Sequence, residues 1–312
     1  MIREIKTDNR EEWKNLRSQY IGGSDSAAVV GLNPFKSAYS LWAEKTGKLP
    51  PFEGNLTTEV GAYLEEFVAK LFERETGKKV RRNNRSMIND KYPWAIANID
   101  REVVGEDAVL EIKTTSEMNL KKFKNGDYPP NYYAQLMHYL AVTERKKGYL
   151  AVLIGNRDFR WFEIERDEDE INALMHAEEL LYKCIKEDSA PPTDGTESTS
   201  EAISTLYPES VGESVSLFGY DSKLEQYIAI GNQIKELKEL QDEMANDVKA
   251  FMGESGKGES DSYTVSWISS NRTTFDSKKF AADHSDMDLS DYYKNTPVRT
   301  FRVTEKNGGK TK

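Results

Sequence analysis

The feature that most constrains this sequence is the stretch from Tyr92 to Ser116. It alternates apolar residues with polar or small ones on both sides of a break at Gly105-Glu106-Asp107. Alternation with a period of two is typical of strands, and a glycine-containing break between two such runs indicates a turn. The stretch therefore predicts two strands joined as a hairpin.

The second of these strands carries an acid and an amine side by side. A period of two puts Leu110 and Ile112 on one face and Glu111 and Lys113 on the other. Asp100 closes the first strand, and the hairpin brings it beside Glu111. Carboxylates are ligands for hard divalent cations, which activate water for phosphodiester cleavage. The group predicts a metal-dependent hydrolytic site, although Glu-x-Lys on a strand is also the pattern of an ordinary solvent-exposed ion pair.

Length and composition limit the classes of protein to consider. The chain has 312 residues, 38% of them hydrophobic and 11% aromatic, which is enough for one large domain or two modest ones. Its single cysteine, Cys184, excludes internal disulfides, iron–sulfur clusters and cysteine-rich zinc sites, and its three histidines are far apart. No apolar run is long enough for a membrane span, and the first residues do not form a secretory signal. We therefore expect a cytoplasmic protein with no membrane partner.

The charge balance bears on nucleic acid as a partner. A formal net charge of -10 argues against indiscriminate DNA binding, because phosphate affinity comes largely from Lys and Arg. Local basic patches at 78–85 and 121–124 can still bind a phosphate backbone, with acidic outer faces focusing DNA into a positive channel. Either patch can equally be an ordinary solvated face.

The N-terminal region contains a second candidate site. After a predicted helix over 10–19, Gly22-Gly23-Ser24 opens an Ala- and Val-rich segment. This pattern predicts a turn, an N-cap at Ser24 and a short buried helix. Free backbone N–H groups there suit a phosphate, and Arg17 can donate to the same anion. The plain alternative is that Ser24 only caps the helix.

The elements that follow indicate an α/β domain with a mixed central sheet. Glu65 lies beside the apolar stripe of a predicted helix over 57–76, either in a cleft or simply exposed. Gln135 and Tyr139 share one face of a second predicted helix over 131–143. In chain order we predict a helix over 57–76, the hairpin, a helix over 131–143, strands over 147–154 and 159–165, and a helix capped by Asp167.

The C-terminal third differs in composition. A Pro-, Ser- and Thr-rich stretch over 189–204 indicates a linker. Beyond it, apolar residues from 227 to 251 follow steps of three and four, which predicts a long amphipathic helix able to pair with another helix or to lie on the first domain. We also predict a flexible segment over 253–260, strands over 263–267 and 299–303, and a disordered basic tail from Lys306. The predicted domains are 1–192, a linker over 193–219 and a C-terminal appendage over 220–312.

Five linked motifs together resemble those of the YqaJ-type phage recombinases, which are relatives of the lambda-type exonucleases. Asp100, ten intervening residues and Glu111-Ile112-Lys113 also match the signature of the restriction-endonuclease-like nucleases. The resemblance covers roughly residues 10–192 and implies a restriction-endonuclease-like core. The motifs are Ile21-Gly22-Gly23-Ser24-Asp25, Tyr39-Ser40-Leu41-Trp42-Ala43-Glu44-Lys45-Thr46-Gly47, Gly61-x-x-Leu64-Glu65, the hairpin, and Gln135-x-x-x-Tyr139.

This resemblance implies an exonuclease that digests linear double-stranded DNA from the 5′ end and leaves 3′ single-stranded overhangs for recombination. Family members need Mg²⁺, for which we expect Mn²⁺ to substitute. The resemblance also implies a homo-oligomer, a trimeric ring in the lambda-type relatives, and a partner of the RecT-like single-strand annealing kind. Such a protein is encoded by a phage or prophage and works in the cytoplasm of the bacterial host.

The resemblance also assigns roles to individual residues. Asp100 and Glu111 would bind the metal together with the backbone carbonyl of Ile112, and Glu65 would complete the metal environment through water. Lys113 would position or deprotonate the attacking water, and Gln135 would steady Lys113 or a metal-bound water. The residues expected to grip the terminal 5′ phosphate are Arg17, Ser24 and, with a looser match, Lys36.

Two other functions fit the same sequence. One is an endonuclease built on the same core, which needs no free DNA end. The other is a non-catalytic DNA-binding or assembly module that retains the fold. The presence of Asp100, Glu111 and Lys113 together favours an enzyme over such a module.

Overall fold

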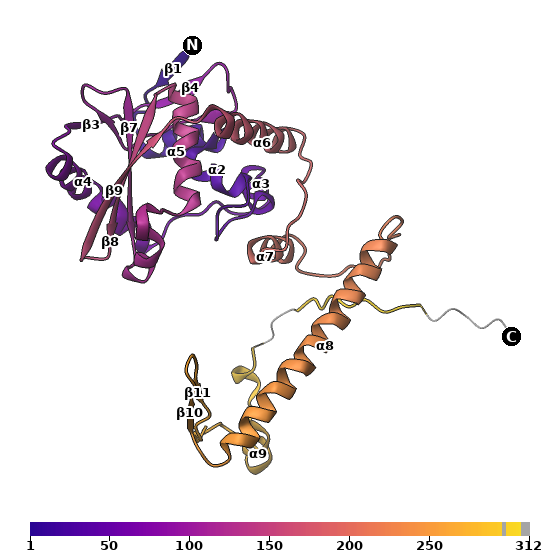
Figure 1. Ribbon diagram of the computed structural model, residues 1–312. Helices are drawn as coiled ribbons and strands as arrows, with labels where there is room; N and C mark the ends of the chain where they lie inside the picture. Colours follow the sequence, from indigo (N-terminus) through magenta and orange to yellow (C-terminus); the bar gives the residue numbers. More distant parts are fainter. Residues whose placement is uncertain (295–297, 307–312) are drawn as a thin grey trace. The chain divides into compact units, whose positions relative to one another are not determined.

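The structure is a computed structural model that describes residues 1–294 and 298–306 (Figure 1). The chain divides into two compact units, Met1–Tyr207 and a second unit that begins at Pro208. Within the described residues, no helix combines the length and apolar character needed to cross a membrane.

The first unit is built on a mixed central sheet, as the sequence predicted, and this sheet has five strands. The strand order is β3-β6-β7-β8-β9, in which β7 and β8 are parallel and the other neighbours antiparallel. Because β7 and β8 are parallel, the chain must cross over between them, and it does so through a helix. The strands are β3 (Val80–Arg82), β6 (Arg101–Val103), β7 (Ala108–Thr115), β8 (Lys147–Ile154) and β9 (Asp158–Glu165).

The hairpin is present, but its first strand is shorter than predicted. β6 and β7 pair with Arg101 opposite Leu110, and Gly105 turns the chain with φ 84°. The earlier part of the predicted strand forms β5 (Ala95–Ile96), which pairs in parallel with β2 (Ile21–Gly22) in a separate small sheet. Asp100 lies between the two pieces, so it precedes β6 and does not close a strand.

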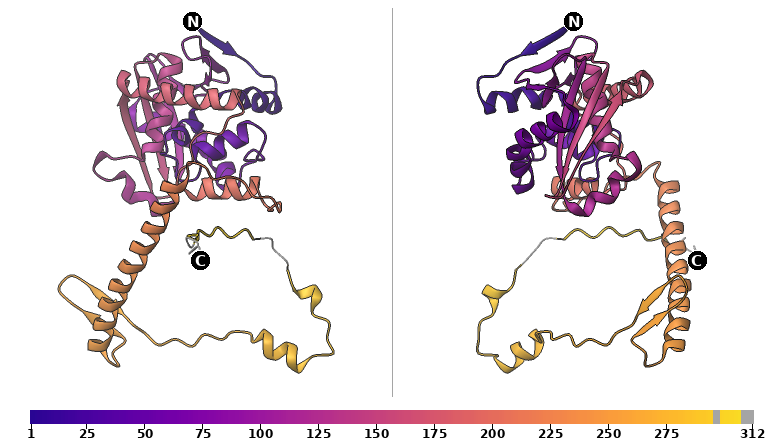
Figure 2. Two further views of the ribbon diagram at one scale, coloured as in Figure 1. Left: turned by 90° about the vertical axis from the view of Figure 1, so that its right-hand side faces the viewer. Right: turned by 60° about the vertical axis from the view of Figure 1, so that its left-hand side comes forward.

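Helices cover both faces of the sheet (Figures 1 and 2). α4 (Leu56–Thr76) starts at Asn55, whose side chain accepts from the Thr58 N–H, and ends at Gly77 with φ 72°. α5 (Pro130–Thr143) is the crossover helix and packs on β8, and α6 (Glu168–Lys186) packs on α5. α4 packs on β7 and β8.

Alternate residues of β7 therefore enter two different cores. Leu110 and Ile112 lie in a cluster with Val68 and Phe72 of α4. Val109 lies in a second cluster that contains residues of α5 and α6. This confirms the predicted separation of the two faces. Burial on both faces holds β7 in one register, since a shift by one residue would exchange the faces.

Part of the N-terminal segment packs against α5 and α6. β1 (Ile2–Ile5) pairs with β4 (Ser86–Asn89), and α1 (Arg10–Ser18), α2 (Gly23–Val29) and α3 (Ala38–Lys45) follow along the chain, as does the 3-10 segment η1 (Glu117–Gly126) after β7. Ser24 is not the N-cap of α2 as predicted. That position is Gly22, whose N–H donates to the Asp25 carboxylate at 3.1 Å.

The predicted linker contains a helix. α7 (Glu197–Leu206) starts at Thr196, whose side chain accepts from the Thr199 N–H, and buries Thr199 and Ala202. Its Ser198 hydroxyl contacts the Ser40 hydroxyl of α3 at 2.9 Å. The polar composition that indicated a linker thus serves capping and helix-to-helix hydrogen bonds, and the first unit extends to Tyr207.

The second unit contains the predicted long helix, α8 (Asp221–Met252). The segment predicted to be flexible contains β10 (Lys257–Glu259), which pairs with β11 (Thr264–Ser266). The predicted strand over 299–303 is absent from the described residues 298–306. From residue 307 the predicted disordered tail lies outside the described residues. The remaining elements are α9 (Ser277–Asp283) and the 3-10 helix η2 (Ser290–Tyr292).

Candidate active site

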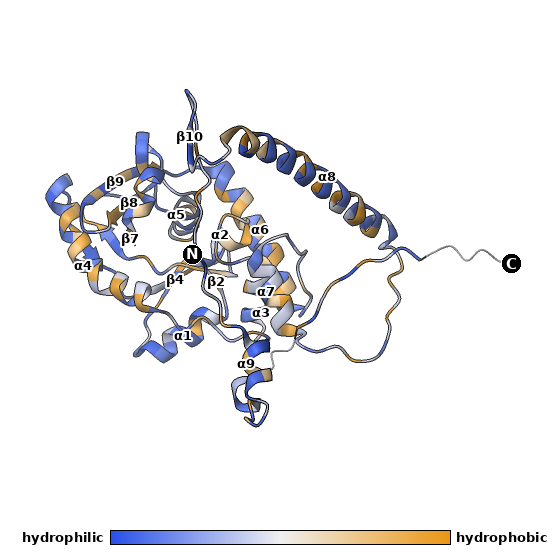
Figure 3. Cartoon of the chain, turned by 90° about the horizontal axis from the view of Figure 1, so that it is seen from below, coloured by the Kyte–Doolittle hydropathy of each residue, from blue (hydrophilic) through white to orange (hydrophobic). Residues whose placement is uncertain are grey.

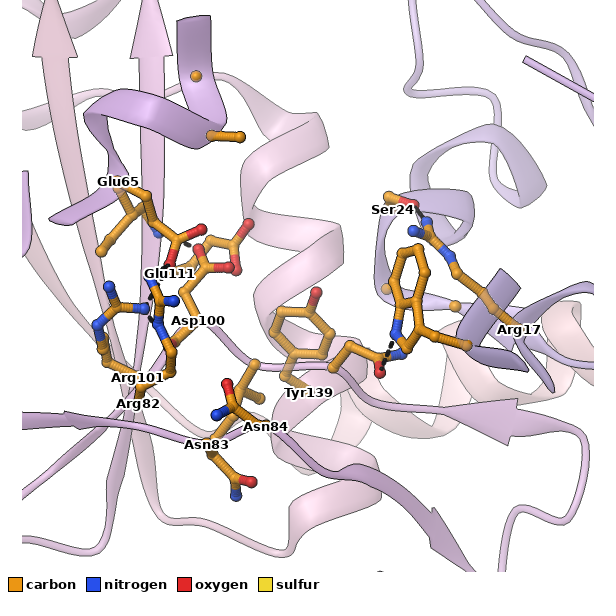
Figure 4. A pocket seen from close by; sticks show the side chains of 18 of the residues that line it. Arg17, Ser24, Glu65, Arg82, Asn83, Asn84, Asp100, Arg101, Glu111 and Tyr139 are labelled. Atoms are coloured by element: carbon orange, nitrogen blue, oxygen red, sulfur yellow. Dashed lines mark hydrogen bonds and ion pairs between the residues drawn. The ribbon is translucent and has the colours of Figure 1, made fainter. Parts of the chain in front are cut away.

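A cavity of about 890 Å³ opens where α1, α2, α4, α5 and β7 meet (Figure 4). Asp100, Glu111 and Lys113 line it together. The predicted geometry required Asp100 and Glu111 on the same side of the sheet, and both line this one cavity. Gln135 and Tyr139 of α5 complete the same wall.

Asp100 is held in place by the strand beside it. Its Oδ2 accepts the N–H of Ile112 at 2.8 Å. Burial, followed by the nearby charge of Glu111, raises the pKa of Asp100 well above its usual value, although Lys113 opposes the shift. The surroundings of Asp100 in the absence of a cation therefore favour its protonated form.

Glu111 and Lys113 form a tight network with α5. The Lys113 ammonium lies 2.6 Å from Glu111 Oε1 and donates to Gln135 Oε1 at 2.8 Å. Gln135 Nε2 in turn donates to Glu111 Oε1 at 2.7 Å and to the Tyr139 hydroxyl at 3.0 Å. The amide of Gln135 thus fixes both charged groups, the position that the resemblance implied for it.

The electrostatics of this network keep Lys113 charged. Burial lowers the pKa of Lys113, but the charges of Glu111 and Asp100 outweigh burial and leave that pKa above its usual value. Burial, with the same two carboxylates, also raises the pKa of Tyr139 well above its usual value. At neutral pH the wall therefore presents an ammonium group and a protonated phenol.

Glu65 of α4 lines the cavity but faces arginines. Its carboxylate pairs with Arg101, whose side chain is 3% exposed, and lies 3.4 Å from Arg82 Nη2. Figure 4 shows Glu65 above these two arginines and close to Asp100 and Glu111. The carboxylate is thus near the predicted metal position, while its charge is already balanced.

The carboxylate oxygens in the cavity are the candidate ligands for a divalent cation. Among the residues that the structure describes, no three His, Cys, Asp or Glu side chains form a ready cation site. Two carboxylates do converge, however, and buried Glu111 Oε2 finds no hydrogen-bond partner in the described part of the chain. A buried carboxylate oxygen without a donor is costly, and a cation would satisfy it. Asp100 and Glu111 therefore fit a divalent cation.

The backbone of β7 can add a third oxygen. The Ile112 N–H points at Asp100, and in a strand the N–H and C=O of one residue face the same edge. The Ile112 carbonyl thus faces the Asp100 side, as a metal ligand there would require. Glu65 lines the same cavity, and its Oε1 is engaged by Arg101.

Arg17 and Ser24 lie across the cavity from the carboxylates, with Tyr139 between them in Figure 4. The Arg17 guanidinium donates to the Ser24 hydroxyl and lies over the Trp13 ring, 5.1 Å from its centroid. Trp13 is fixed by its indole N–H, which donates to Asn98 Oδ1 at 2.9 Å. The structure thus brings together the two main residues predicted to bind phosphate.

Lys36 is placed elsewhere. Its ammonium pairs with Glu44 at 2.7 Å, and Lys36 is not among the described residues that line the cavity. Lys36 lies in the loop that leads into α3. Within this loop, Asn33 Oδ1 accepts the Lys36 backbone N–H at 3.1 Å. The structure therefore does not join Lys36 to Arg17 and Ser24.

Several lining residues were not singled out from the sequence. Arg82, Asn83, Asn84 and Arg85 form one wall of the cavity, and they belong to the basic patch that was predicted only in outline. Arg101 directly follows Asp100, so its place near the site could have been inferred. Trp13 gave no sequence signal beyond its helix.

Fold and site together define an α/β protein in which a mixed sheet and its helices surround a cavity holding two carboxylates and a lysine. Residues 12–146 match the family described as the YqaJ-like viral recombinase domain. The chain is also 37% identical over 305 residues to the protein YqaJ of Bacillus subtilis, covering 95% of each chain. The chain belongs to the YqaJ-like viral recombinase family.

Two solved structures also resemble this chain. The alkaline exonuclease LHK-Exo of Laribacter hongkongensis is 21% identical, with 57% of this chain and 97% of that chain covered and a TM-score of 0.45. A phage-related exonuclease from Haemophilus somnus is 16% identical, with 57% and 100% covered and a TM-score of 0.41.

Proposed function

We propose that this chain is a Mg²⁺-dependent deoxyribonuclease that digests linear double-stranded DNA from the 5′ end and leaves 3′ single-stranded overhangs for homologous recombination. The observation that carries the proposal is the convergence of Asp100, Glu111 and Lys113 in one cavity, with a buried oxygen of Glu111 lacking a partner among the described residues. Membership of a viral recombinase family agrees with it.

The residues that would hold the cation are Asp100 and Glu111, with the Ile112 carbonyl on the same edge and Glu65 acting through water. When bound, Mg²⁺, or Mn²⁺ in its place, would stabilise negative charge on the phosphate and lower the pKa of a water molecule. A bound cation would favour ionisation of both carboxyl groups, which would then balance its charge.

Lys113 and Gln135 would serve the reacting phosphate. Lys113 is held by Glu111 at 2.6 Å and Gln135 at 2.8 Å, so its ammonium has one fixed position. With its raised pKa it is charged, which suits it to orient a water molecule and to stabilise developing negative charge. Proton abstraction by Lys113 would require the charges of both carboxylates to be offset first.

Arg17 and Ser24 would bind the terminal 5′ phosphate, and we refer to this pair as the end subsite. A guanidinium and a hydroxyl provide directed donors for phosphate oxygens. Because the end subsite lies across the cavity from the carboxylates, a DNA end held there would reach toward the metal position. Arg82 and Arg85 line the same cavity and would meet the DNA backbone.

The proposal extends to partners. We retain the homo-oligomer and a RecT-like single-strand annealing protein as partners, and the cytoplasm of a bacterial host as the place of action. What supports assembly is α8, whose apolar residues are exposed, Leu237 at 66% and Met244 at 68%. An exposed apolar stripe of this length is typical of an interaction surface.

Digestion of defined DNA tests the function. Linear duplexes with a 5′ phosphate or a 5′ hydroxyl, and a closed circular plasmid, are incubated with Mg²⁺ or with chelator. We expect loss of the linear duplexes with Mg²⁺ alone, faster from the 5′ phosphate, while the circle stays intact. Cutting of the circle would indicate an endonuclease. Intact linear DNA with Mg²⁺ would contradict the proposal.

A further inference from the structure

The last residue of α3, Lys45, lies largely covered next to the end subsite. Its side chain is 10% exposed, and its ammonium donates to the carbonyls of Tyr20 at 2.7 Å and Arg17 at 3.1 Å. It also lies 3.0 Å from Asp25 Oδ2. An ammonium group has three N–H donors, and these three oxygens are enough to satisfy them.

Asp25 connects this cluster to the start of α2. Besides Lys45, the same oxygen accepts the Gly22 N–H at 3.1 Å. The charges of Lys45 and Arg17 outweigh burial and leave the pKa of Asp25 below its usual value, so the carboxylate is ionised. The chain from Arg17 to Asp25 thus folds around one ammonium group.

Neighbouring residues on α2 face opposite ways. Ser24 is exposed and lines the cavity, whereas Asp25 is 8% exposed and turns inward to Lys45. Neither Asp25 nor Lys45 is among the described residues that line the cavity. The pair therefore has no direct access to a ligand there.

A buried ion pair contributes little net stability compared with apolar residues of the same volume, and its attested benefit is a fixed geometry. Here the geometry that it fixes is that of the end subsite. Lys45 binds the backbone carbonyl of Arg17 itself, and Asp25 directly follows Ser24. Without the pair, the end of α1 and the start of α2 lose their common anchor.

We propose that Asp25 and Lys45 are positioning residues that hold Arg17 and Ser24 in the geometry needed to recognise a 5′ phosphate. This inference rests on the proposed function of the end subsite. It gives a role to the segment from Tyr39 to Gly47, which the sequence singled out and which the metal site does not use.

Binding without turnover separates this proposal from catalysis. Fluorescence anisotropy in chelator measures the Kd of the full chain for 3′-labelled duplexes that carry either a 5′ phosphate or a 5′ hydroxyl. We expect the parent to bind the phosphorylated end about tenfold more tightly or better, as charged hydrogen bonds provide. Arg17→Ala gives the ratio of the two Kd values expected when the proposed contact between Arg17 and the 5′ phosphate is lost.

Two variants test the pair. Lys45→Met removes the ammonium group, and Asp25→Asn with Lys45→Met leaves no uncompensated buried charge if the single variant folds poorly. In both variants we expect the ratio of the Kd for the 5′-hydroxyl duplex to the Kd for the 5′-phosphate duplex to fall toward one. The affinity for the 5′-hydroxyl duplex should stay unchanged. Lys48→Met is the matched control, because Lys48 pairs with exposed Asp188 at 2.8 Å and should keep the parental preference.

The outcomes are distinct. Folded variants that keep the parental preference would overturn the positioning role, as would an equal loss of affinity for both duplexes. A parent without any phosphate preference would overturn both this role and the end subsite. A parent that prefers the phosphate but digests no DNA would contradict the nuclease proposal while leaving this one supported by its variants.

Discussion

The side chains at the cavity wall contact one another closely. Glu111 is 2% exposed in its side chain and touches both Lys113 and Gln135, so a change at any of these three alters the others. Arg101 and Arg82 balance the charge of Glu65 close to these residues (Figure 4). The site is therefore a network, and effects of substitutions within it will not add.

Lys113→Ala tests the ammonium group. Because Lys113 would orient water and stabilise charge, we expect turnover on linear duplex DNA to fall by about 100-fold or more. Affinity for DNA should change little, since Arg17, Arg82 and Arg85 remain. Initial rates and anisotropy on the same preparation measure both. Lys183→Ala, which removes an exposed pair with Glu179, is the control; parental turnover in Lys113→Ala would make Lys113 structural only.

Glu106 predicts an acid-sensitive contribution to stability. Hydrogen bonds from Lys78 and from Tyr149, the latter at 2.8 Å, lower the pKa of Glu106 to about 2 from an ordinary 4.5. A lowered pKa stabilises the folded state fully above pH 4.5, and this stabilisation is lost as the pH falls toward 2. Urea unfolding across this range should show a smaller loss in Glu106→Gln. An equal fall in the free energy of unfolding with pH in parent and variant would contradict this role of Glu106.

The residues found from the sequence are those fixed by local rules. Strand alternation and one turn place Glu111 and Lys113, and spacing along the chain brings Asp100 near them. Glu65 and Lys45 could not be placed in this way, because Arg101 and the carbonyls of Arg17 and Tyr20 reach them only through packing of separate elements. The local pattern predicts Ser24 as the N-cap of α2. In the structure the N-cap is Gly22, whose N–H donates to the Asp25 carboxylate.

At the scale of elements, close approach of α5 to its neighbours sets the shape of the cavity. Gly148 of β8 allows Leu136 of α5 to pack directly on the strand, and a Cβ there would lie 2.6 Å from Leu136 Cδ2. Gly23 of α2 likewise lies against the ring of Tyr139. These glycines let the helix that carries Gln135 reach Lys113.

Gly148→Ala should therefore destabilise the first unit. Forcing a methyl group against Leu136 costs about 1–3 kcal/mol by overpacking. Gly195→Ala is the matched control, since no described atom lies within 4 Å of its added Cβ, and its effect should stay within about 0.5 kcal/mol. Chemical denaturation of the full chain measures both, and equal stability of the two variants would contradict the packing argument.

Elements with regular periodicity were predicted well, and short polar ones were not. α4, α5, α8, β8 and β9 follow apolar patterns long enough to identify. The Ser and Thr residues of α7 resemble loop composition and predict a linker, whereas in the structure they cap the helix and contact α3. β10 contains Gly258 and forms by pairing with β11, which local sequence does not reveal.

At the scale of the whole molecule, α8 is the feature that points to assembly. All of its residues are at least partly exposed, and Figure 3 shows hydrophobic residues recurring along it. Their 3.5-residue repeat matches a facing helix, and one polar residue, Gln241, interrupts it, as happens where register is specified. The repeat consists of Tyr227, Ile230, Ile234, Leu237, Gln241, Met244, Val248 and Phe251.

Substitution on this stripe tests the homo-oligomer. Ile234→Asp with Leu237→Asp puts charges on the apolar face, so we expect the full chain to move to the monomer mass in light scattering after size exclusion. Lys235→Asp changes the charge on another face of the same helix, where Lys235 is 78% exposed, and should leave the mass unchanged. An oligomer that survives the double substitution would show that assembly does not use α8.

In the proposed enzyme, Asp100 and Glu111 share one divalent cation. The most direct measurement is the anomalous X-ray signal of Mn²⁺ in crystals grown with that ion. We expect an anomalous peak within ligand distance of both Asp100 and Glu111, next to the Ile112 carbonyl, and no such peak in Glu111→Gln. Crystals with Mn²⁺ bound elsewhere, or with none between these carboxylates at millimolar concentration, would contradict the account.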